Sequence, residues 1–349
     1  EIYQCDWSSD VCSSDLYMKR FYENVFYKYI DDNNIKSIIH CGDIVDRRKY
    51  VNIYSAYRLR KDLIEPAMNR GITWHQCLGN HDTFHKNTNE VSSFTELFGS
   101  YNNYTTLNIY DKATEVMFGE NKLLLIPWIC DDNKEHSFKL IKETDAQIAF
   151  GHLELEGFEM FKGSISHGDD PALFGRFDSV YSGHFHHRSS RGNIHYLGAA
   201  AEYTWSDYND PRGFSIFDTE TRELTFVQNP YKMFHKFWYN DGDQKFLDTE
   251  IDYSQFANKI IKIIIQEKNN PYWFEQFIDL VEKQNPVDVQ VVEDHLNLGL
   301  EETQDIIDEA ESTIDIFKRY INNVDIKGVS KEKLEKKISD LYFEALTLE

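Results

Sequence analysis

The sequence predicts a mixed α/β sandwich followed by a smaller α/β domain. Hydrophobic residues make up 41% of the 349 residues and aromatic residues 15%, which is typical of a packed globular protein. Short apolar runs that end near glycine alternate with segments of helical periodicity. Hairpin signals follow these units, and they favour a sandwich over a simple doubly wound sheet.

The elements of the first domain are expected between residues 17 and 230. Residues 17–34 place apolar side chains at helical spacing, and the polar residues 31–34 end that helix. A second helix is expected over residues 53–68. Strands are expected at the apolar runs 37–43, 72–80, 122–128, 146–152, 178–184, 193–200 and 214–228, the last of which forms a hairpin around residues 219–221.

The character of the sequence changes after residue 230. Residues 258–267 predict a strand, residues 271–284 a helix and residues 287–294 a strand, so residues 231–300 are expected to form a small second domain. Residues 301–349 predict two further helices, whose apolar stripe suits either a core or a partner helix.

Charge and composition limit the classes of function. A net charge of −22 opposes bulk electrostatic binding of nucleic acid, but it permits a local basic surface or a metal-mediated contact with phosphate. No apolar run approaches the ~20 residues of a membrane span, and no secretory signal is visible. Two of the five cysteines lie within residues 1–16, and the other three are widely spaced, as expected for free thiols in a reducing cytoplasm, where we place the protein.

Polar residues of metal-ligand type follow four of the apolar runs. A lone Gly-His pair carries no weight, but the ordered set does, and ligand sites in α/β proteins collect at the carboxyl ends of strands. Mixed carboxylate, amide and imidazole ligands favour Mn, Fe or Zn, and two such ions suit the displacement of a phosphoryl group. The runs are HCGDIVD with Asp43 and Asp46, CLGNHD with Asn80, His81 and Asp82, AFGH with His152, and YSGHFHH with His184, His186 and His187.

This ordered set of motifs resembles the calcineurin-like metallophosphoesterase superfamily. Within it, the segments HCGDIVDRRKY, LGNHDTFHKN, LIPWIC and SGHFHHRS resemble the SbcD-type DNA repair nucleases, especially the recombination endonuclease subunit of phages. The resemblance implies an αββα metallophosphoesterase sandwich, a small capping domain and C-terminal helices. It also implies a DNA exonuclease and endonuclease that depends on two divalent metal ions, with Mn²⁺ expected, and that acts in double-strand-break repair and recombination.

The resemblance also implies roles for individual residues. Asp46 and Asp82 are expected to support the site from behind, Asp82 by orienting the ring of His81. His187 is expected to face solvent. The expected metal ligands are Asp43, which bridges both ions, Asn80, His152 and His184 on the second ion and His186 on the first, and His81 is the expected catalytic residue. Arg47, Arg48, Lys49, His85 and Lys86 are candidates for DNA contact, and ordinary surface charge is an equal alternative for each of the first three.

The resemblance further implies partners. An SbcC-type coiled-coil ATPase is expected to contact residues 301–349. A homodimer is expected, with the helix near residues 53–68 and the segment after Asn87 as candidate interfaces. If the gene is phage-encoded, the compartment is the cytoplasm of the bacterial host.

One family motif is missing. The first motif, D-x-H, occurs nowhere in the sequence, and no histidine precedes His40. The first metal site would therefore keep only Asp43 and His186. Residues 1–16, EIYQCDWSSDVCSSDL, resemble a translated sequencing adapter, and we expect an artefact joined to a truncated gene; a genuine, diverged N-terminus is the alternative. We expect the chain as written to be weak or inactive until the missing strand is restored.

Two other functions fit parts of the sequence. The segment GDIVDR also resembles phosphoprotein phosphatases of the same superfamily, but Arg48 stands where that branch has Gly, and GNHD replaces its GNHE. A non-catalytic scaffold that binds DNA and the ATPase is supported only by the missing motif.

Overall fold

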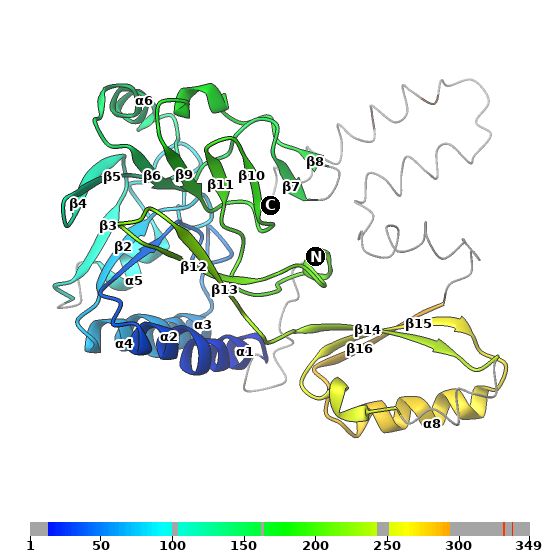
Figure 1. Cartoon of the computed structure of the whole chain (residues 1–349). Helices are drawn as coiled ribbons and strands as arrows, with labels where there is room; N and C mark the ends of the chain where they lie inside the picture. The colour runs from blue at the N-terminus through cyan, green and yellow to red at the C-terminus, as the bar shows by residue number, and fades with distance from the viewer. Residues whose placement is uncertain are drawn as a thin grey trace. The chain divides into compact units, whose positions relative to one another are not determined.

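The computed structural model describes residues 13–99, 104–161, 164–242 and 251–293, with positions 331 and 337 (Figure 1). The chain divides into two compact units, Glu1–Val292 and Glu293–Glu349, and the first of them is described below. Residues 1–12 of the expected artefact, and the expected helices of residues 301–349 apart from two positions, lie outside the described residues.

Two β-sheets form the centre of the first unit (Figure 1). One is parallel, in the order β1-β2-β3. The other is mixed, in the order β10-β11-β9-β6-β5-β4. A buried apolar cluster includes Cys77, Leu125, Phe150 and Tyr181 and joins side chains of both sheets. The strands are β1 Ser37–His40, β2 Thr73–Cys77, β3 Leu107–Tyr110, β4 Thr114–Phe118, β5 Asn121–Ile126, β6 Ile148–Gly151, β9 Ser179–Ser182, β10 Ser189–Arg191 and β11 Ile194–Tyr196.

Helices cover the sandwich. The N-terminal helix comprises α1 Ser13–Phe21, the π-helical turn η1 Tyr22–Phe26 and α2 Tyr27–Asp32, and the next comprises α3 Ile53–Arg58, the π-helical turn η2 Leu59–Ile64 and α4 Glu65–Asn69. Both helices, with α5 Ser93–Phe98, pack on the parallel sheet through a cluster that includes Ile30, Ile64 and Trp74. Helix α6 Lys134–Glu143 packs on the mixed sheet through Ile141. The predicted order of helix, two sheets and helix is confirmed.

Smaller elements surround this core. The predicted hairpin is present as β12 Gly213–Phe217 and β13 Leu224–Gln228, and Phe214 lies with its ring centroid 5.0 Å from that of Phe26. Among the described residues, β1 is the first strand of the chain and pairs with β2 on one edge only. The remaining elements are β7 Glu159–Phe161, β8 Ser164–Ile165 and the 3-10 helices η3 Pro171–Phe174, η4 Trp205–Asp207 and η5 Tyr253–Phe256.

A third sheet follows the sandwich. Strands β14 Phe234–Asn240, β15 Ile260–Glu267 and β16 Asp288–Glu293 pair in that order, and helix α8 Pro271–Glu282 packs on one face (Figure 1). The predicted strand, helix and strand are therefore present, preceded by a strand, β14, that the sequence pattern did not predict. The boundary at residue 231 stays a prediction, because the sheet belongs to the same compact unit. No helix among the described residues is long and apolar enough to cross a membrane.

Candidate metal centre

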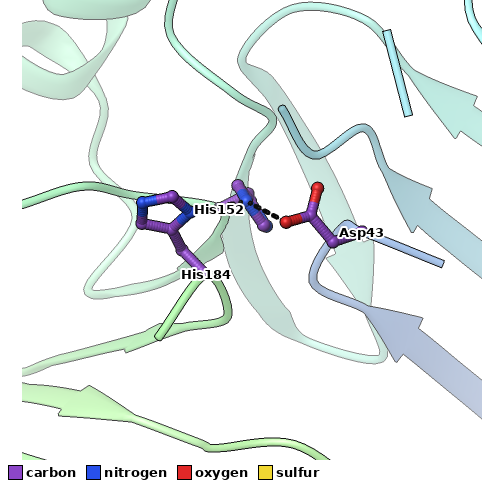
Figure 2. Close-up of side chains that lie close together, drawn as sticks. All are labelled: Asp43, His152 and His184. Carbon is purple, nitrogen blue, oxygen red and sulfur yellow. Dashed lines mark hydrogen bonds and ion pairs between the residues drawn. The ribbon is translucent and has the colours of Figure 1, made fainter. Parts of the chain in front are cut away.

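Four loops that leave parallel strands converge. Asp43 follows β1 and Asn80 follows its parallel neighbour β2, while His152 follows β6 and His184 follows its parallel neighbour β9. Because neighbouring parallel strands end at the same sheet edge, each pair of loops starts side by side. Figure 2 shows Asp43, His152 and His184 pointing toward one another.

Two glycines permit this close approach. Gly42 has a φ of 93°, and a Cβ at this position would collide with the ring of His152. A Cβ on Gly79 would collide with the carboxylate of Asp43. The two residues that follow a glycine into the centre also have left-handed backbones, with φ of 55° at Asp43 and 75° at His184. Such conformations are uncommon outside glycine and concentrate at functional sites.

The side-chain nitrogen and oxygen atoms of Asp43, Asn80, His152 and His184 lie close together in a cluster. Nε2 of His152 is 3.1 Å from Oδ2 of Asp43 and 2.8 Å from Oδ1 of Asn80. Nδ1 of His184 is 3.1 Å from Oδ1 of Asn80 and 3.1 Å from Nε2 of His152. His152 is fully buried, whereas Asp43, Asn80 and His184 are half-buried.

These atoms fit a divalent metal ion. Nδ1 of His152 lies 2.7 Å from the carbonyl of Cys41, which can only accept, so Nδ1 carries the proton and the lone pair of Nε2 faces other acceptors. Ligands about 2.1 Å from one ion stand about 3 Å apart, which matches the observed separations. Nδ1 is the atom of His184 in this cluster, so Nε2 would carry the proton of its ring; Nε2 has no hydrogen-bond partner and lies 3.9 Å from Oε2 of Glu154.

Burial and neighbouring charges set the protonation states of the same side chains. Burial alone would raise the pKa of Asp43, but His152 and His81 outweigh it and hold that pKa well below its usual range. Burial, followed by repulsion from His152, lowers the pKa of His184 to about 3, so its ring is neutral. An ionised carboxylate and a neutral imidazole are the forms that bind metal. Burial would lower the pKa of His152, but Asp43 outweighs it and raises that pKa above its usual value, so a metal ion would displace a proton from this ring.

His81 lies beside this cluster with a fixed ring. Its backbone N–H donates to Oδ1 of Asp43 at 2.8 Å, and its Nδ1 lies 2.5 Å from the carbonyl of Asp46. The backbone of Asp46, and not the side chain of Asp82 as expected, therefore orients the ring. Nε2 is left as the ring atom that can exchange a proton with a substrate.

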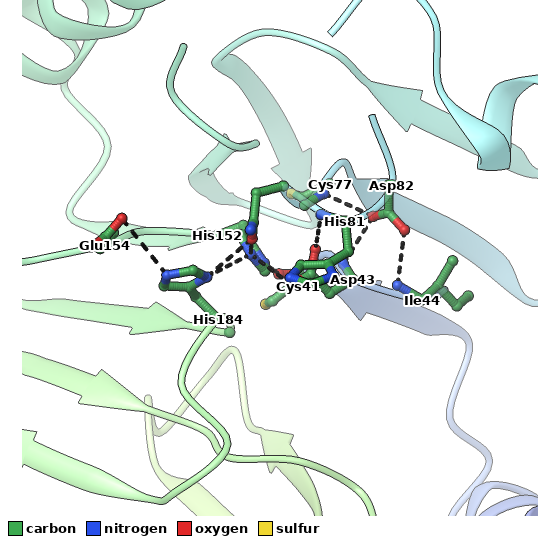
Figure 3. Close-up of polar contacts among 12 residues, drawn as sticks. Cys41, Asp43, Ile44, Cys77, His81, Asp82, His152, Glu154 and His184 are labelled. Carbon is green, nitrogen blue, oxygen red and sulfur yellow. Dashed lines mark hydrogen bonds and ion pairs between the residues drawn. The ribbon is translucent and has the colours of Figure 1, made fainter. Parts of the chain in front are cut away.

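Asp82 has a different position from the one expected. It is fully buried, and its carboxylate accepts the backbone N–H groups of Gly79 and Asp43, both at 2.8 Å, and of Ile44 at 3.0 Å (Figure 3). It therefore ties the loop that carries Asn80 to the loop that carries Asp43. This is still a supporting role behind the ligands, exerted on the backbone instead of on the His81 ring.

The remaining histidines of the GHFHH segment lie apart. Asp43, His152 and His184 form the one group of metal-binding side chains with donor atoms within 4.8 Å in the described part of the chain, and His186 is not a member. His186 is exposed, and its carbonyl accepts from the buried guanidinium of Arg212. His187 is half-buried and contacts Oδ2 of Asp210 through Nδ1 at 2.9 Å, so it is held by the protein instead of simply facing solvent.

The candidate DNA contacts differ in their surroundings. The guanidinium of Arg47 lies over the ring of Tyr50 at 5.2 Å, and its Nε is 3.6 Å from Asp46. Arg48 is half-buried, its Nη1 has no hydrogen-bond partner, and Asp43 is the charge that acts on it. Lys49, His85 and Lys86 are exposed.

Sequence reasoning missed one aromatic wall of the centre. The ring of Trp128 lies 5.4 Å from that of His184 and 6.1 Å from that of His152. Trp128 ends the apolar run that contains β5, so the rule that located the candidate ligands, polar residues at the carboxyl ends of strands, would have found it only if it had included aromatic residues.

The fold and the centre define a metallophosphoesterase. The calcineurin-like phosphoesterase family matches residues 11–188, and the chain belongs to this family. Its relatives include exonuclease subunit 1 of Enterobacteria phage T4, 33% identical over 320 residues that cover 91% of this chain and 90% of the relative. The SbcD component of the SbcCD nuclease of Staphylococcus epidermidis is 29% identical over 150 residues, 38% of this chain and 35% of the relative. The chain is therefore a phosphoesterase with nuclease relatives.

Proposed function

We propose that the chain is a DNA phosphodiester hydrolase, with exonuclease and endonuclease activity, that depends on two divalent metal ions and acts in double-strand-break repair and recombination. The observation that carries the proposal is the cluster of lone-pair atoms from Asp43, Asn80, His152 and His184 with His81 beside it. The names of the relatives, an exonuclease subunit and a nuclease subunit, favour DNA over other phosphoesters.

The residues of the chain would divide the work of hydrolysis. Asp43, Asn80, His152 and His184 would hold one ion, and Asp43 with His186 would contribute to the other. When bound, the ions supply charge stabilisation to the phosphoryl group and an activated water. Nε2 of His81 would give a proton to the leaving oxygen, since Nδ1 is engaged by the Asp46 carbonyl. Arg48, with an unpaired buried Nη1, is the most favoured of the candidate DNA contacts.

The mixed ligand set favours Mn, Fe or Zn, and the resemblance to metallophosphoesterase nucleases favours Mn²⁺ among them. The sequence lacks D-x-H, so we propose that the first ion binds more weakly than the second and that this chain is impaired as a nuclease. Metal titration of the full chain should then give one tight Mn²⁺ per chain and one much weaker. Two equally tight ions, or full nuclease activity, would contradict the proposed impairment.

The test of the function uses end-labelled duplex DNA and circular single-stranded DNA with Mn²⁺. We expect cleavage that His81→Asn and His152→Ala each lower by about 10²-fold or more. His136→Asn is the matched control, because His136 lies on α6 and contacts the Ala113 carbonyl. A wild-type chain that hydrolyses a phosphopeptide but not DNA would favour the phosphatase alternative. Binding of DNA with no hydrolysis in Mn²⁺, even after a D-x-H strand is restored, would favour the scaffold.

We also propose two protein partners. An SbcC-type coiled-coil ATPase would bind residues 301–349, which the word subunit in both relatives' names supports. Co-purification of an SbcC-type ATPase with the full chain, but not with a chain that ends at residue 300, would test this contact.

A second copy of the chain would bind at the helix near residues 53–68, where Ile53 is 88% exposed and Tyr57 44% exposed. Sedimentation of wild type and Ile53→Asp tests the dimer. An unchanged dimer mass in the variant would show that the dimer interface lies outside this helix.

A further inference from the structure

The unit Glu1–Val292 contains a basic cleft that the metal centre does not use. It has a volume of about 280 Å³ and lies between α1, residues 230–232 and residues 257–259. Arg20, Lys232 and Lys259 line it, and none of the described lining residues is acidic. In a chain of net charge −22, a surface concavity with this composition selects anions.

Two of these basic side chains form no ion pair with a described residue. Among the described residues, neither Arg20 nor Lys259 has a carboxylate within ion-pair distance, whereas Lys232 lies 3.4 Å from Oε1 of the buried Glu202. The guanidinium of Arg20 lies over the ring of Tyr231, 4.7 Å from its centroid. Stacking occupies the face of the guanidinium and leaves its N–H edge free for a phosphate.

The aromatic platform under Arg20 is held at both ends. The hydroxyl of Tyr17 donates to the carbonyl of Tyr231, and Nδ2 of Asn24 donates to the hydroxyl of Tyr231 at 3.4 Å. Tyr17 is itself buried, at 8% exposure. Arg20 therefore rests on a pre-organised surface, which lowers the entropy lost when it binds a ligand.

Contacts connect the cleft to the metal-centre loop. Nζ of Lys232 also donates to the carbonyl of Asp210 at 3.3 Å, and Oδ2 of Asp210 contacts Nδ1 of His187 at 2.9 Å. The cleft is thus linked to the His184–His187 segment through Lys232 and Asp210. A polyanion with regularly spaced phosphates offers several contacts to such a cleft, whereas a single phosphate offers one.

We propose that this cleft binds the backbone phosphates of a DNA strand whose scissile phosphate lies at the metal centre. Arg20 and Lys259 contact the phosphates, and Lys232 fixes the cleft relative to the metal loop. The proposal rests on the proposed nuclease function for the identity of the polymer. It goes beyond that function because it assigns substrate binding to residues outside the family motifs.

The experiment measures binding of a fluorescein-labelled single-stranded 20-mer to the full chain in EDTA, so that metal-bound phosphate does not contribute. We expect Arg20→Gln/Lys259→Gln to bind about tenfold more weakly than the control, and the slope of log K against log salt to shrink by about 1.4, for two lost contacts. The control is Lys139→Gln/Lys142→Gln on α6, which removes the same charge from an exposed helix. Equal DNA affinity and equal salt slope in the two double variants would refute the proposal that this cleft binds DNA.

Two further measurements separate the explanations. Arg20→Lys keeps the positive charge but loses the two parallel N–H donors of the guanidinium. It should therefore have the salt slope of wild type but bind the 20-mer more weakly than wild type. Hydrolysis of bis(p-nitrophenyl) phosphate with Mn²⁺ tests the metal centre alone, and all of these variants should match wild type. If this hydrolysis were absent even from a chain with a D-x-H strand restored, the proposed function would be defeated, while the binding comparison would still decide whether the cleft binds DNA.

Discussion

The substitution Asp82→Asn tests whether one buried carboxylate holds the two metal loops together. Asp82 is fully buried, and Oδ2 accepts the N–H groups of Gly79 and Asp43 at 2.8 Å, while Oδ1 accepts those of Ile44 at 3.0 Å and Val45 at 3.4 Å. Asparagine has the same shape but one acceptor. Its NH₂ group must therefore face at least one backbone donor.

The magnitude follows from the contacts that asparagine can keep. The least costly orientation places the amide nitrogen at Oδ1 and loses the contacts to Ile44 and Val45. A hydrogen bond to a charged group contributes about 1.5–3 kcal/mol, and removing a buried charge offsets part of the loss. We expect the free energy of unfolding to fall by about 2–3 kcal/mol. The affinity for Mn²⁺ should fall by about tenfold or more, because the backbone of Asp43 is less fixed.

Urea denaturation and calorimetric Mn²⁺ titration measure the two quantities. Asp132→Asn is the control, since Asp132 is exposed and accepts one hydroxyl bond from Thr88 at 3.3 Å; it should change stability by less than about 0.5 kcal/mol. If Asp82→Asn matched this control in both measurements, the bridging role of the carboxylate would be refuted.

Three further predictions concern single residues. Gly79→Ala should lower Mn²⁺ affinity by about tenfold or more in the same titration, because its Cβ displaces the carboxylate of Asp43; unchanged affinity would contradict this. Burial, with repulsion from a neighbouring lysine, lowers the pKa of Lys236 to about 8 from 10.5, so stability should rise with pH across that window. Lys236→Met should abolish the rise and be about 2 kcal/mol more stable at pH 7 in urea; a persistent rise would implicate other groups. Arg212→Met removes one partner from the His186 carbonyl and the only cation paired with the buried Asp207 among the described residues, and urea unfolding should show a loss of about 3–5 kcal/mol, whereas a loss under 1 kcal/mol would show that water replaces the arginine.

The four strands that precede the cluster, β1, β2, β6 and β9, were predictable because each is a short apolar run that ends at or near a glycine. Strands β3 and β4 and helices α5 and α6 of the sandwich were not predicted. Strand β14 was also not predicted, since its sequence FHKFWYN does not alternate cleanly. Lys236 is only 3% exposed within this strand, with its amine 4.6 Å from the ring centroid of Tyr208. A lysine whose partner is an aromatic ring distant in the sequence appears as a surface residue in any local pattern.

The candidate metal centre was predictable to the level of its residue types. The pairing of Asp43 with Asn80 and of His152 with His184 follows from strand ends, whereas the meeting of the two pairs depends on how the two sheets pack. The position of Asp82 does not follow from strand ends, because its partners are backbone N–H groups, which leave no trace in residue types. The fixed position of His187 depends in the same way on Asp210, a residue outside every motif.

The wide spacing of the ligands along the chain has a consequence for folding. The donor atoms of the cluster come from loops between positions 43 and 184, after strands of both sheets. Such long-range contacts form late, because the closure entropy of long loops must be overcome first. No short fragment of the chain contains all the side chains of the cluster. During refolding, Mn²⁺ should therefore bind only after both sheets have formed and packed. The binding of Mn²⁺ during refolding should therefore report the last step of folding. Proteolytic fragments that contain only one of the two sheets should bind the ion no better than unstructured peptides.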